Sequence, residues 1–577
     1  MKKLMLGNEA VARGLYEGGL RVASSYPGTP STEITECVAK YDEIYSEWAP
    51  NEKVAMETAI GASIAGARSF CAMKHVGLNV AADPLFTVSY TGVNAGMVIA
   101  VADDPGMHSS QNEQDSRHYA KASKIMMLEP SDSNECLSFA KKAFDLSEKF
   151  DTPVILRLTT RIAHSRSAAE ISDRVDNGLK ECVKDPQKYV MMPAMAIKRH
   201  VVVEQRIREQ TEWAETCELN TVEYNDKKIG IIASGICYQY AKEALGKNAS
   251  YLKLGCVYPL PVKKIRDFVS NCEKVYVLEE LDPFIEEHCK INGINVIGKE
   301  AFTLLGEYSQ GLIRKVILGQ DVENVKTDLE IPGRPPVLCA GCPHRGLYYA
   351  LKKLKVAVSG DIGCYTLGAL QPLGMVDTCV CMGASVSALH GRNKANPENE
   401  TKSVAVIGDS TFMHSGITGL VDIAYNQSNS TVIILDNSIT GMTGHQDNPT
   451  TGKTIKGDPT TAVSLEKLCN AVGIDRVRVV DPYNLKECED VIREEINTPE
   501  PSVVISRRPC ALLKYVKHNP PLKVNADKCT GCKMCMKIGC PAISIKDKKS
   551  VIDFTQCVGC GVCTQMCKFD AIEGGAK

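Results

Sequence analysis

The sequence predicts an α/β fold of several domains with mostly parallel sheets, followed by a small cysteine-rich domain. The first observation is that segments rich in β-branched residues alternate with helical patterns, which is typical of stacked βαβ units. The second is that eight cysteines fall within the 39 residues from 529 to 567. The segments that read as buried strands are 152–160, 228–235, 274–280, 402–410 and 430–438.

The length and composition are those of a globular protein of several domains. The 577 residues correspond to roughly four domains. Of these residues, 44% are hydrophobic and 24% charged, and the net charge is −2, so no strong field favours nucleic acid as a partner. We read no export signal at the start, and no apolar run approaches the ~18 residues of a membrane-spanning helix. These features predict a cytoplasmic protein without nucleic-acid or membrane partners.

Proline-rich and aperiodic stretches suggest where the domains end. A charged stretch without clear period precedes residue 226, and "IPGRPP" and "HNPP" read as linkers. The predicted order is an α/β domain at 1–165, a connector or insertion at 166–225, a second α/β domain at 226–325, a third at 335–515, and the cysteine-rich domain at 523–577.

The spacing of the last eight cysteines indicates iron–sulfur ligands. In the bacterial pattern C-x2-C-x2-C-x3-C-P, the fourth cysteine serves the other cluster. That pattern predicts two [4Fe–4S] clusters, one held by Cys529, Cys532, Cys535 and Cys567 and the other by Cys557, Cys560, Cys563 and Cys540. Zinc also uses C-x2-C pairs, but three cysteines in succession at this spacing, twice, favour iron–sulfur clusters. The tail resembles bacterial two-cluster ferredoxins over about 523–573, with a longer gap before Cys540.

Two polar residues follow neighbouring predicted strands. Gly408 and Asp409 end the segment "SVAVIGDS", and Asn437 follows "STVIILD". The carboxyl ends of parallel strands meet at one sheet edge, so their oxygens could share a Mg²⁺ ion, with the carbonyl of Ile439 as a third ligand. An ordinary strand-end Gly-Asp turn is the alternative. Gly408 would let the backbone approach a diphosphate.

The same region resembles a known cofactor motif. Gly408-Asp409, with Ser410 in place of a second glycine, followed by Asn437, is similar to the thiamine diphosphate motif. The segments "VLCAGCPHRG", "GDIGCYTLG" and "DTCVCMGASVSALHG" resemble the thiamine diphosphate-binding part of 2-oxoacid:ferredoxin oxidoreductases. This resemblance implies pyrimidine-binding, transketolase C-terminal-like and diphosphate-binding domains. It also implies that the cofactor is lined by Cys342, His344, Cys381, Met382 and Gly383. We interpret Cys339 and Cys342 as packed thiols.

The amino-terminal segments resemble the same family. In "WAPNEKVAMETAIGASIAGA" the resemblance makes Glu52 the acid at the cofactor's aminopyrimidine, whereas periodicity alone does not separate it from Glu57. "SSYPGTPSTEI" makes Thr29 a substrate-binding candidate, and "NEQDSRHYA" does so for Arg117. His75 is expected either near the cofactor or in a structural role.

The resemblance, which covers nearly the whole chain, implies the reaction and the partners. It implies the large subunit of an enzyme that oxidatively decarboxylates an aryl 2-oxo acid with coenzyme A, using thiamine diphosphate, Mg²⁺ and two [4Fe–4S] clusters. A smaller subunit and ferredoxin are the implied partners. The alternatives are the same reaction on pyruvate or branched-chain 2-oxo acids, a non-redox thiamine decarboxylase with a structural tail, and a pure electron carrier or scaffold.

Overall fold

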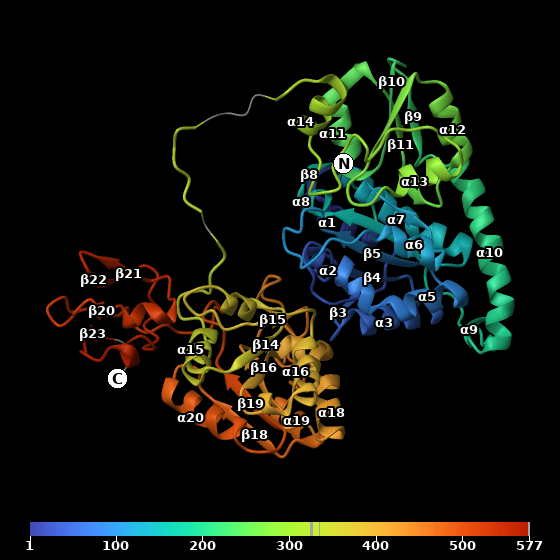
Figure 1. Ribbon diagram of the computed structural model, residues 1–577. Coiled ribbons are helices and arrows are strands. Elements are labelled where there is room, and N and C mark those ends of the chain that lie inside the picture. Colours follow the sequence, from blue (N-terminus) through green and yellow to red (C-terminus); the bar gives the residue numbers. More distant parts are fainter. Residues whose placement is uncertain (323–326, 334, 575–577) are drawn as a thin grey trace. The chain divides into compact units, whose positions relative to one another are not determined.

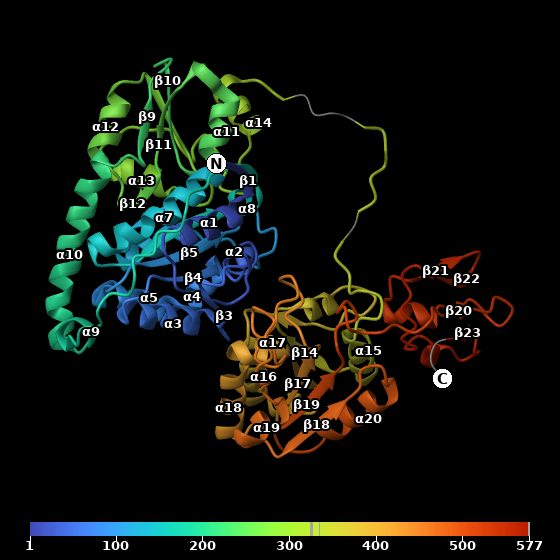
Figure 2. The same cartoon turned by 180° about the vertical axis from the view of Figure 1, so that it is seen from behind.

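A computed structural model of the chain describes residues 1–322, 327–333 and 335–574. It consists of two compact units, Met1–Asp328 and Leu329–Lys577 (Figures 1 and 2). Residues 323–325 of the predicted second domain and 575–577 of the predicted tail lie outside the described residues. Within the described ranges, no helix is both long and apolar enough to cross a membrane.

The first unit is built around a seven-stranded sheet in the order β12-β6-β7-β5-β4-β2-β3. All neighbours are parallel except β12, which pairs with β6 in the antiparallel direction. The predicted strand at 152–160 is confirmed as β7. The strands are β2 (Val22–Ser25), β3 (Tyr45–Trp48), β4 (Ser69–Lys74), β5 (Met97–Asp103), β6 (Met127–Leu128), β7 (Val154–Thr159) and β12 (Cys256–Tyr258).

Helices cover both faces of this sheet, which explains why its central strand β5 is apolar at successive positions. In β5, Val98 and Ala100 pack in one core with α1 (Gly7–Glu17) and α7 (Ser133–Phe150). The alternate residues Ile99 and Val101 pack in a second core with α3 (Glu52–Ile64) and α5 (Ala82–Thr91). Side chains alternate between the faces of a strand, so a strand covered on both sides buries apolar residues at successive positions.

A second, four-stranded sheet has the order β13-β10-β11-β9. The predicted strands at 228–235 and 274–280 are confirmed as β10 (Ile229–Ala233) and β13 (Lys274–Leu278). The other two are β9 (Thr221–Glu223) and β11 (Ser250–Lys253).

The region 166–225, read as a connector, contains regular structure. β8 (Arg166–Glu170) pairs with β1 (Lys2–Leu6), and β9 lies at the other end of the region. Between them, the 24-residue helix α10 (Pro193–Thr216) runs along the unit (Figure 1). It buries only a narrow stripe of side chains, so the sequence carries little helical apolar pattern. The buried residues of α10 are Val203, Arg206, Gln210 and Ala214.

The second unit contains a parallel sheet in the order β15-β14-β16-β17-β19-β18. The predicted strands at 402–410 and 430–438 are confirmed as β16 (Ser403–Gly408) and β17 (Thr431–Asp436). Helices α15 (His344–Leu354) and α20 (Leu485–Ile496) pack in one core, and α16 (Ala384–Ala395) and α18 (Ile417–Tyr425) in the other. The remaining strands are β14 (Ala357–Gly360), β15 (Thr378–Cys379), β18 (Arg476–Val480) and β19 (Ser502–Arg507). The predicted α/β class is therefore confirmed.

The cysteine-rich tail contains two short antiparallel pairs. β20 (Lys523–Val524) pairs with β23 (Ile572–Glu573), and β21 (Ile543–Lys546) pairs with β22 (Lys549–Ile552). The small core of the tail includes many of its thiols. With so little aliphatic side-chain volume, a domain of this size requires bound metal or similar crosslinks for stability.

Candidate active site

Asp409 and Asn437 lie at the carboxyl ends of two adjacent parallel strands, as predicted from the sequence. Gly408 ends β16 opposite Leu435 of β17, and Asn437 follows β17 directly. One corner of the Asn437 amide is 3.3 Å from Oδ1 of Asp409 and 2.8 Å from the carbonyl oxygen of Ile439. With the amide nitrogen at this corner, Asn437 donates to both oxygens. With the amide oxygen turned to this corner, three oxygens would converge as ligands of the kind that Mg²⁺ prefers.

The Asp409 carboxyl is held in place by neighbouring donors. Its Oδ2 accepts hydrogen bonds from Nδ2 of Asn448 at 3.4 Å and Oγ1 of Thr450 at 3.3 Å. The residue is 2% exposed, and its burial, reinforced by the charge of Asp436, raises its pKa to about 7. A cation would remove this electrostatic penalty, so the residues fit the metal that the sequence predicts.

Asp361 fixes the predicted turn 381–383. This carboxylate is fully buried after β14 and accepts N–H groups from Gly383 at 2.9 Å and Ser385 at 2.9 Å. Gly383 has φ +85°, and a Cβ there would lie 2.3 Å from Oγ of Ser415. The same hydroxyl donates to the carbonyl of Met382 at 2.8 Å. The turn therefore leads into α16 in a conformation that only glycine accommodates.

Asp361 is a residue that the sequence analysis missed as part of the site. Its signal was present, since it directly follows a strand, as Asp409 does. The neighbouring candidates differ in exposure: Cys381 is exposed, whereas Ser410 is buried and accepts a hydrogen bond from Oγ1 of Thr440 at 3.0 Å.

His344 and Cys342 are uncharged residues at the start of α15. Burial, followed by the charge of Arg345, lowers the pKa of His344 to about 4, so its imidazole is neutral at pH 7. The ring meets Tyr365 edge-on with the ring centroids 5.9 Å apart. Burial raises the pKa of Cys342 to about 12, which keeps it a thiol unless a metal removes the proton.

Cys342 belongs to a group of four cysteines drawn from distant parts of the chain. Cys339 and Cys364 contribute to the electrostatic environment of Cys342, and Cys510 interacts with Cys339 and Cys364. Cys339 is exposed, which does not fit its interpretation as a packed thiol. Cys364 and Cys510 were not singled out from the sequence because they carry no local spacing signal.

In the tail, each predicted set of four cysteines lines one cavity. One pocket is lined by Cys540, Cys557, Cys560 and Cys563, and a second by Cys529, Cys532, Cys535 and Cys567. Each predicted set of ligands is therefore brought to one place in the tail.

The pocket that contains Cys540 borders the segment that precedes α15. Gly341, Cys342 and Arg345 line it together with the tail cysteines. Arg345 donates through Nη1 to the carbonyl of Ile538 at 3.3 Å and to that of Gly539, and through Nε to the carbonyl of Cys339 at 3.0 Å. The tail is therefore joined directly to the part of the unit that contains the predicted cofactor residues.

In the first unit, Glu52 is the first residue of α3 and is 4% exposed. A Cβ on Gly77, in α4 (His75–Val80), would lie 2.6 Å from its Oε1, so the carboxyl group reaches the neighbouring helix. Glu57, the alternative left open by periodicity, is exposed and paired with Lys53. Burial therefore distinguishes the two acids and favours Glu52 as the functional one.

Thr29 and His75 lie at the same carboxyl edge of the seven-stranded sheet. Oγ of Ser109 donates to the carbonyl of Thr29 at 3.4 Å. Nε2 of His75 is 3.2 Å from the carbonyl of Asn112, and burial lowers the pKa of His75. The loop at 104–116 thus links both residues.

Three parts of the chain match known families. Residues 13–230 match "Pyruvate flavodoxin/ferredoxin oxidoreductase, thiamine diP-bdg", residues 361–506 match "Thiamine pyrophosphate enzyme, C-terminal TPP binding domain", and residues 550–573 match "4Fe-4S binding domain". The chain is 42% identical to indolepyruvate oxidoreductase subunit IorA of Archaeoglobus fulgidus, over 99% of this chain and 97% of the relative. The protein of that name from Pyrococcus horikoshii is also 42% identical, with the same coverage. The chain belongs to the IorA family of indolepyruvate oxidoreductase subunits.

Two more distant similarities are also found. 2-Oxoglutarate synthase subunit KorA of Methanothermobacter thermautotrophicus is 30% identical over 29% of this chain and 47% of the relative. A solved 2-oxoglutarate:ferredoxin oxidoreductase from Magnetococcus marinus has a TM-score of 0.47 and 20% identity, covering 55% of this chain and 65% of that one. As an IorA-family member, the chain is part of a 2-oxoacid:ferredoxin oxidoreductase that binds thiamine diphosphate and an iron–sulfur cluster.

One predicted site residue of this IorA-family chain does not fit its expected role. Arg117 is fully buried and pairs with Asp115 and Glu279. It also donates to the carbonyls of Glu280 at 3.1 Å and Asp282 at 3.0 Å. Its donors are committed to this network, so contact with a substrate would require breaking it. The network joins the first sheet to the segment after β13 and gives Arg117 a structural role.

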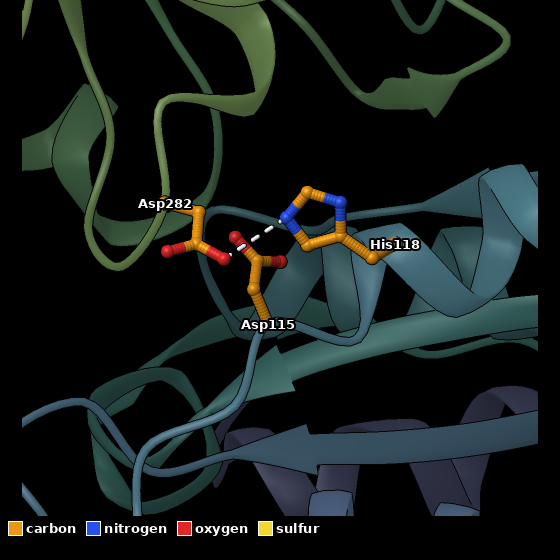
Figure 3. A group of neighbouring side chains, drawn as sticks. All are labelled: Asp115, His118 and Asp282. Atoms are coloured by element: carbon orange, nitrogen blue, oxygen red, sulfur yellow. Dashed lines mark hydrogen bonds and ion pairs between the residues drawn. The ribbon is translucent and has the colours of Figure 1, made fainter.

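A neighbouring group of potential metal ligands is best explained by the same network. Figure 3 shows Asp115, His118 and Asp282 converging, with Nε2 of His118 2.9 Å from Oδ2 of Asp282. Asp115 is already paired with the buried guanidinium of Arg117, whose positive charge would oppose a cation. We therefore assign no metal to this group.

Proposed function

We propose that this chain is the large subunit of an enzyme that oxidatively decarboxylates aryl pyruvates, indolepyruvate above all. The reaction is: aryl pyruvate, coenzyme A and two oxidised ferredoxins give aryl-acetyl-CoA, CO2, one proton and two reduced ferredoxins. The electrons pass through two [4Fe–4S] clusters. A smaller subunit completes the enzyme, in keeping with the relatives' description as subunits of indolepyruvate oxidoreductase.

The observation that carries this proposal is a pocket lined both by residues of the tail and by residues of the predicted cofactor domain. The cavity containing Cys540 and Cys560 is also lined by Cys342 and Arg345 at the start of α15. His344, on the same turn, is a predicted cofactor residue. A one-electron carrier in that cavity would lie beside the domain where oxidation takes place, which supports electron exit through the tail.

Separate groups of residues would bind the metal ion, the diphosphate and the aminopyrimidine of the cofactor. Asp409, Asn437 and the Ile439 carbonyl would hold Mg²⁺, and Gly408, Ser410 and the turn at 381–383 would approach the diphosphate. Thiamine diphosphate, when bound, supplies the electron sink that allows a 2-oxo acid to release CO2. The buried carboxyl of Glu52 would hold a proton at the aminopyrimidine. Neutral His344 adds no charge to the site.

The crossed cluster ligation is tested with paired cysteine variants. If Cys567 serves the cluster of Cys532, the double variant Cys532→Ser/Cys567→Ser loses one cluster, about four iron atoms. Cys532→Ser/Cys540→Ser then loses both. Uncrossed ligation predicts the opposite assignment of the two losses. Iron content and EPR of the reduced protein measure this, and Cys182→Ser, which alters an exposed thiol in the first unit, is the control.

The substrate is tested with a panel of 2-oxo acids on the complex with its partner subunit. With coenzyme A and a viologen dye, we expect the highest kcat/KM for indolepyruvate and phenylpyruvate and lower values for pyruvate and 2-oxoisovalerate. An equal or higher value for pyruvate would overturn the aryl assignment. Release of free aldehyde without coenzyme A dependence, unchanged after deletion from about residue 520, would instead indicate a non-redox decarboxylase.

A further inference from the structure

Lys74 is a buried cation at the edge of the sheet where Thr29 and His75 lie. It is the last residue of β4 and is 8% exposed. Its Nζ donates to the carbonyl of Ser109 at 2.6 Å and lies 3.4 Å from the hydroxyl of the same residue. Among the described residues, no carboxylate oxygen lies within 4.0 Å of this Nζ, the distance that defines an ion pair.

The other buried cations at this edge have carboxylate partners. Arg117 pairs with Asp115 and Glu279, and Arg157 with Asp103 and Glu129. A buried ammonium group without such a partner is costly unless an anion compensates it.

Asp104 is the acid whose charge acts on Lys74, but it does not form an ion pair with it. Its Oδ2 accepts the N–H of Ser109 at 2.9 Å and the hydroxyl of Ser110 at 2.6 Å, and its Oδ1 accepts from Thr160 at 2.7 Å. Burial lowers the pKa of Lys74 to about 8, which leaves the group largely protonated at pH 7. Lys74 is therefore a positive charge held inside the protein with only neutral direct partners.

We propose that Lys74 binds the carboxylate of the 2-oxo acid substrate. The inference rests on the proposed function, since every 2-oxo acid carries this anion. The link from Lys74 through the Ser109 hydroxyl to the Thr29 carbonyl places the ammonium beside a residue already expected to contact substrate. Arg117, which the sequence analysis expected to bind substrate, is paired with Asp115 and Glu279 instead. Lys74 takes its place.

The interaction is made with the ground state, because the carboxylate leaves as CO2. Loss of the interaction between Lys74 and the substrate carboxylate should therefore affect KM more strongly than kcat. In the complex with the partner subunit, Lys74→Met is expected to raise KM for indolepyruvate at least tenfold while kcat stays within threefold. Lys74→Arg should restore part of the affinity. Lys53→Met, which removes an exposed lysine from the neighbouring helix, should leave both constants unchanged.

A pair of inhibitors separates anion binding from a structural role. Indole-3-propionate and indole-3-propionamide differ only in the charge of the terminal group. The wild-type enzyme should bind the carboxylate at least tenfold more tightly than the amide, and Lys74→Met should remove this preference. Equal weakening of both inhibitors, or an unchanged KM, would overturn the proposal.

The two proposals fail in different ways. If pyruvate proves to be the better substrate, the aryl assignment fails, and Lys74→Met is then expected to raise KM for pyruvate. If the wild-type complex oxidises no 2-oxo acid, the proposed function itself is wrong. A wild-type complex that is active, with Lys74→Met retaining full preference for the carboxylate, refutes the role of Lys74 alone.

Discussion

Replacing Glu52 by glutamine is expected to lower kcat for 2-oxo acid oxidation by about 10²–10⁴-fold, the range for a positioned acid or base. Glutamine keeps the shape that packs against Gly77 but cannot exchange a proton at the aminopyrimidine. Binding of thiamine diphosphate should change little, because the diphosphate and metal residues lie elsewhere. Steady-state turnover and a separate titration of cofactor binding measure the two effects.

Glu57→Gln is the matched control. The two glutamates lie on the same helix, but Glu57 is exposed and paired with Lys53. An exposed i,i+4 ion pair contributes little to stability, and Glu57 lies outside the predicted site, so the kcat of Glu57→Gln should equal that of the wild type. A large loss in Glu57→Gln with normal turnover in Glu52→Gln would exclude Glu52 as the activating acid.

Asp409→Ala is expected to weaken binding of Mg²⁺ and thiamine diphosphate at least about 100-fold, since even partners outside the ligand shell are worth 10–100-fold in metal affinity. Without this carboxylate, Asn437 and the Ile439 carbonyl offer only neutral oxygens. Calorimetry with Mg²⁺ and the cofactor measures the loss. Iron content should be unchanged, and Asp422→Asn, on the exposed side of α18, is the control. Wild-type affinity in Asp409→Ala would refute the metal site.

The same residue predicts how cofactor binding depends on pH. Burial, with the nearby charge of Asp436, raises the pKa of Asp409 to about 7. The cation requires the carboxylate form, so below about pH 7 a proton competes with it, and affinity should fall toward tenfold per pH unit. Above pH 7 it should level off. An affinity that stays constant from pH 8 to 5.5 would contradict this competition.

The α/β fold and the meeting of Asp409 with Asn437 could be predicted because both depend on the order of residues within short segments of the sequence. β5, for example, is apolar at every position from Met97 to Ala102 because helices cover both faces of the sheet. Asp409 and Asn437 meet because each follows a strand and the two strands are parallel neighbours. The tail cysteines could be grouped because their spacing is local, and each predicted set lines a single cavity.

The features that sequence reasoning missed depend on contacts between distant segments. Arg117 is buried because Glu279, 162 residues away, lies beside it. β12 joins the first sheet although its neighbours in sequence belong to the second. The association of Cys364 and Cys510 with Cys339 likewise depends on tertiary packing. The predicted domain limits and the roles of individual residues remain predictions.

The most direct measurement is EPR of the anaerobic complex after indolepyruvate and coenzyme A are added without an external acceptor. The proposed function predicts that reduced [4Fe–4S] signals appear together with indoleacetyl-CoA, and that Glu52→Gln shows neither on the same timescale. Formation of free aldehyde while the clusters stay oxidised would contradict electron transfer from the 2-oxo acid into the tail.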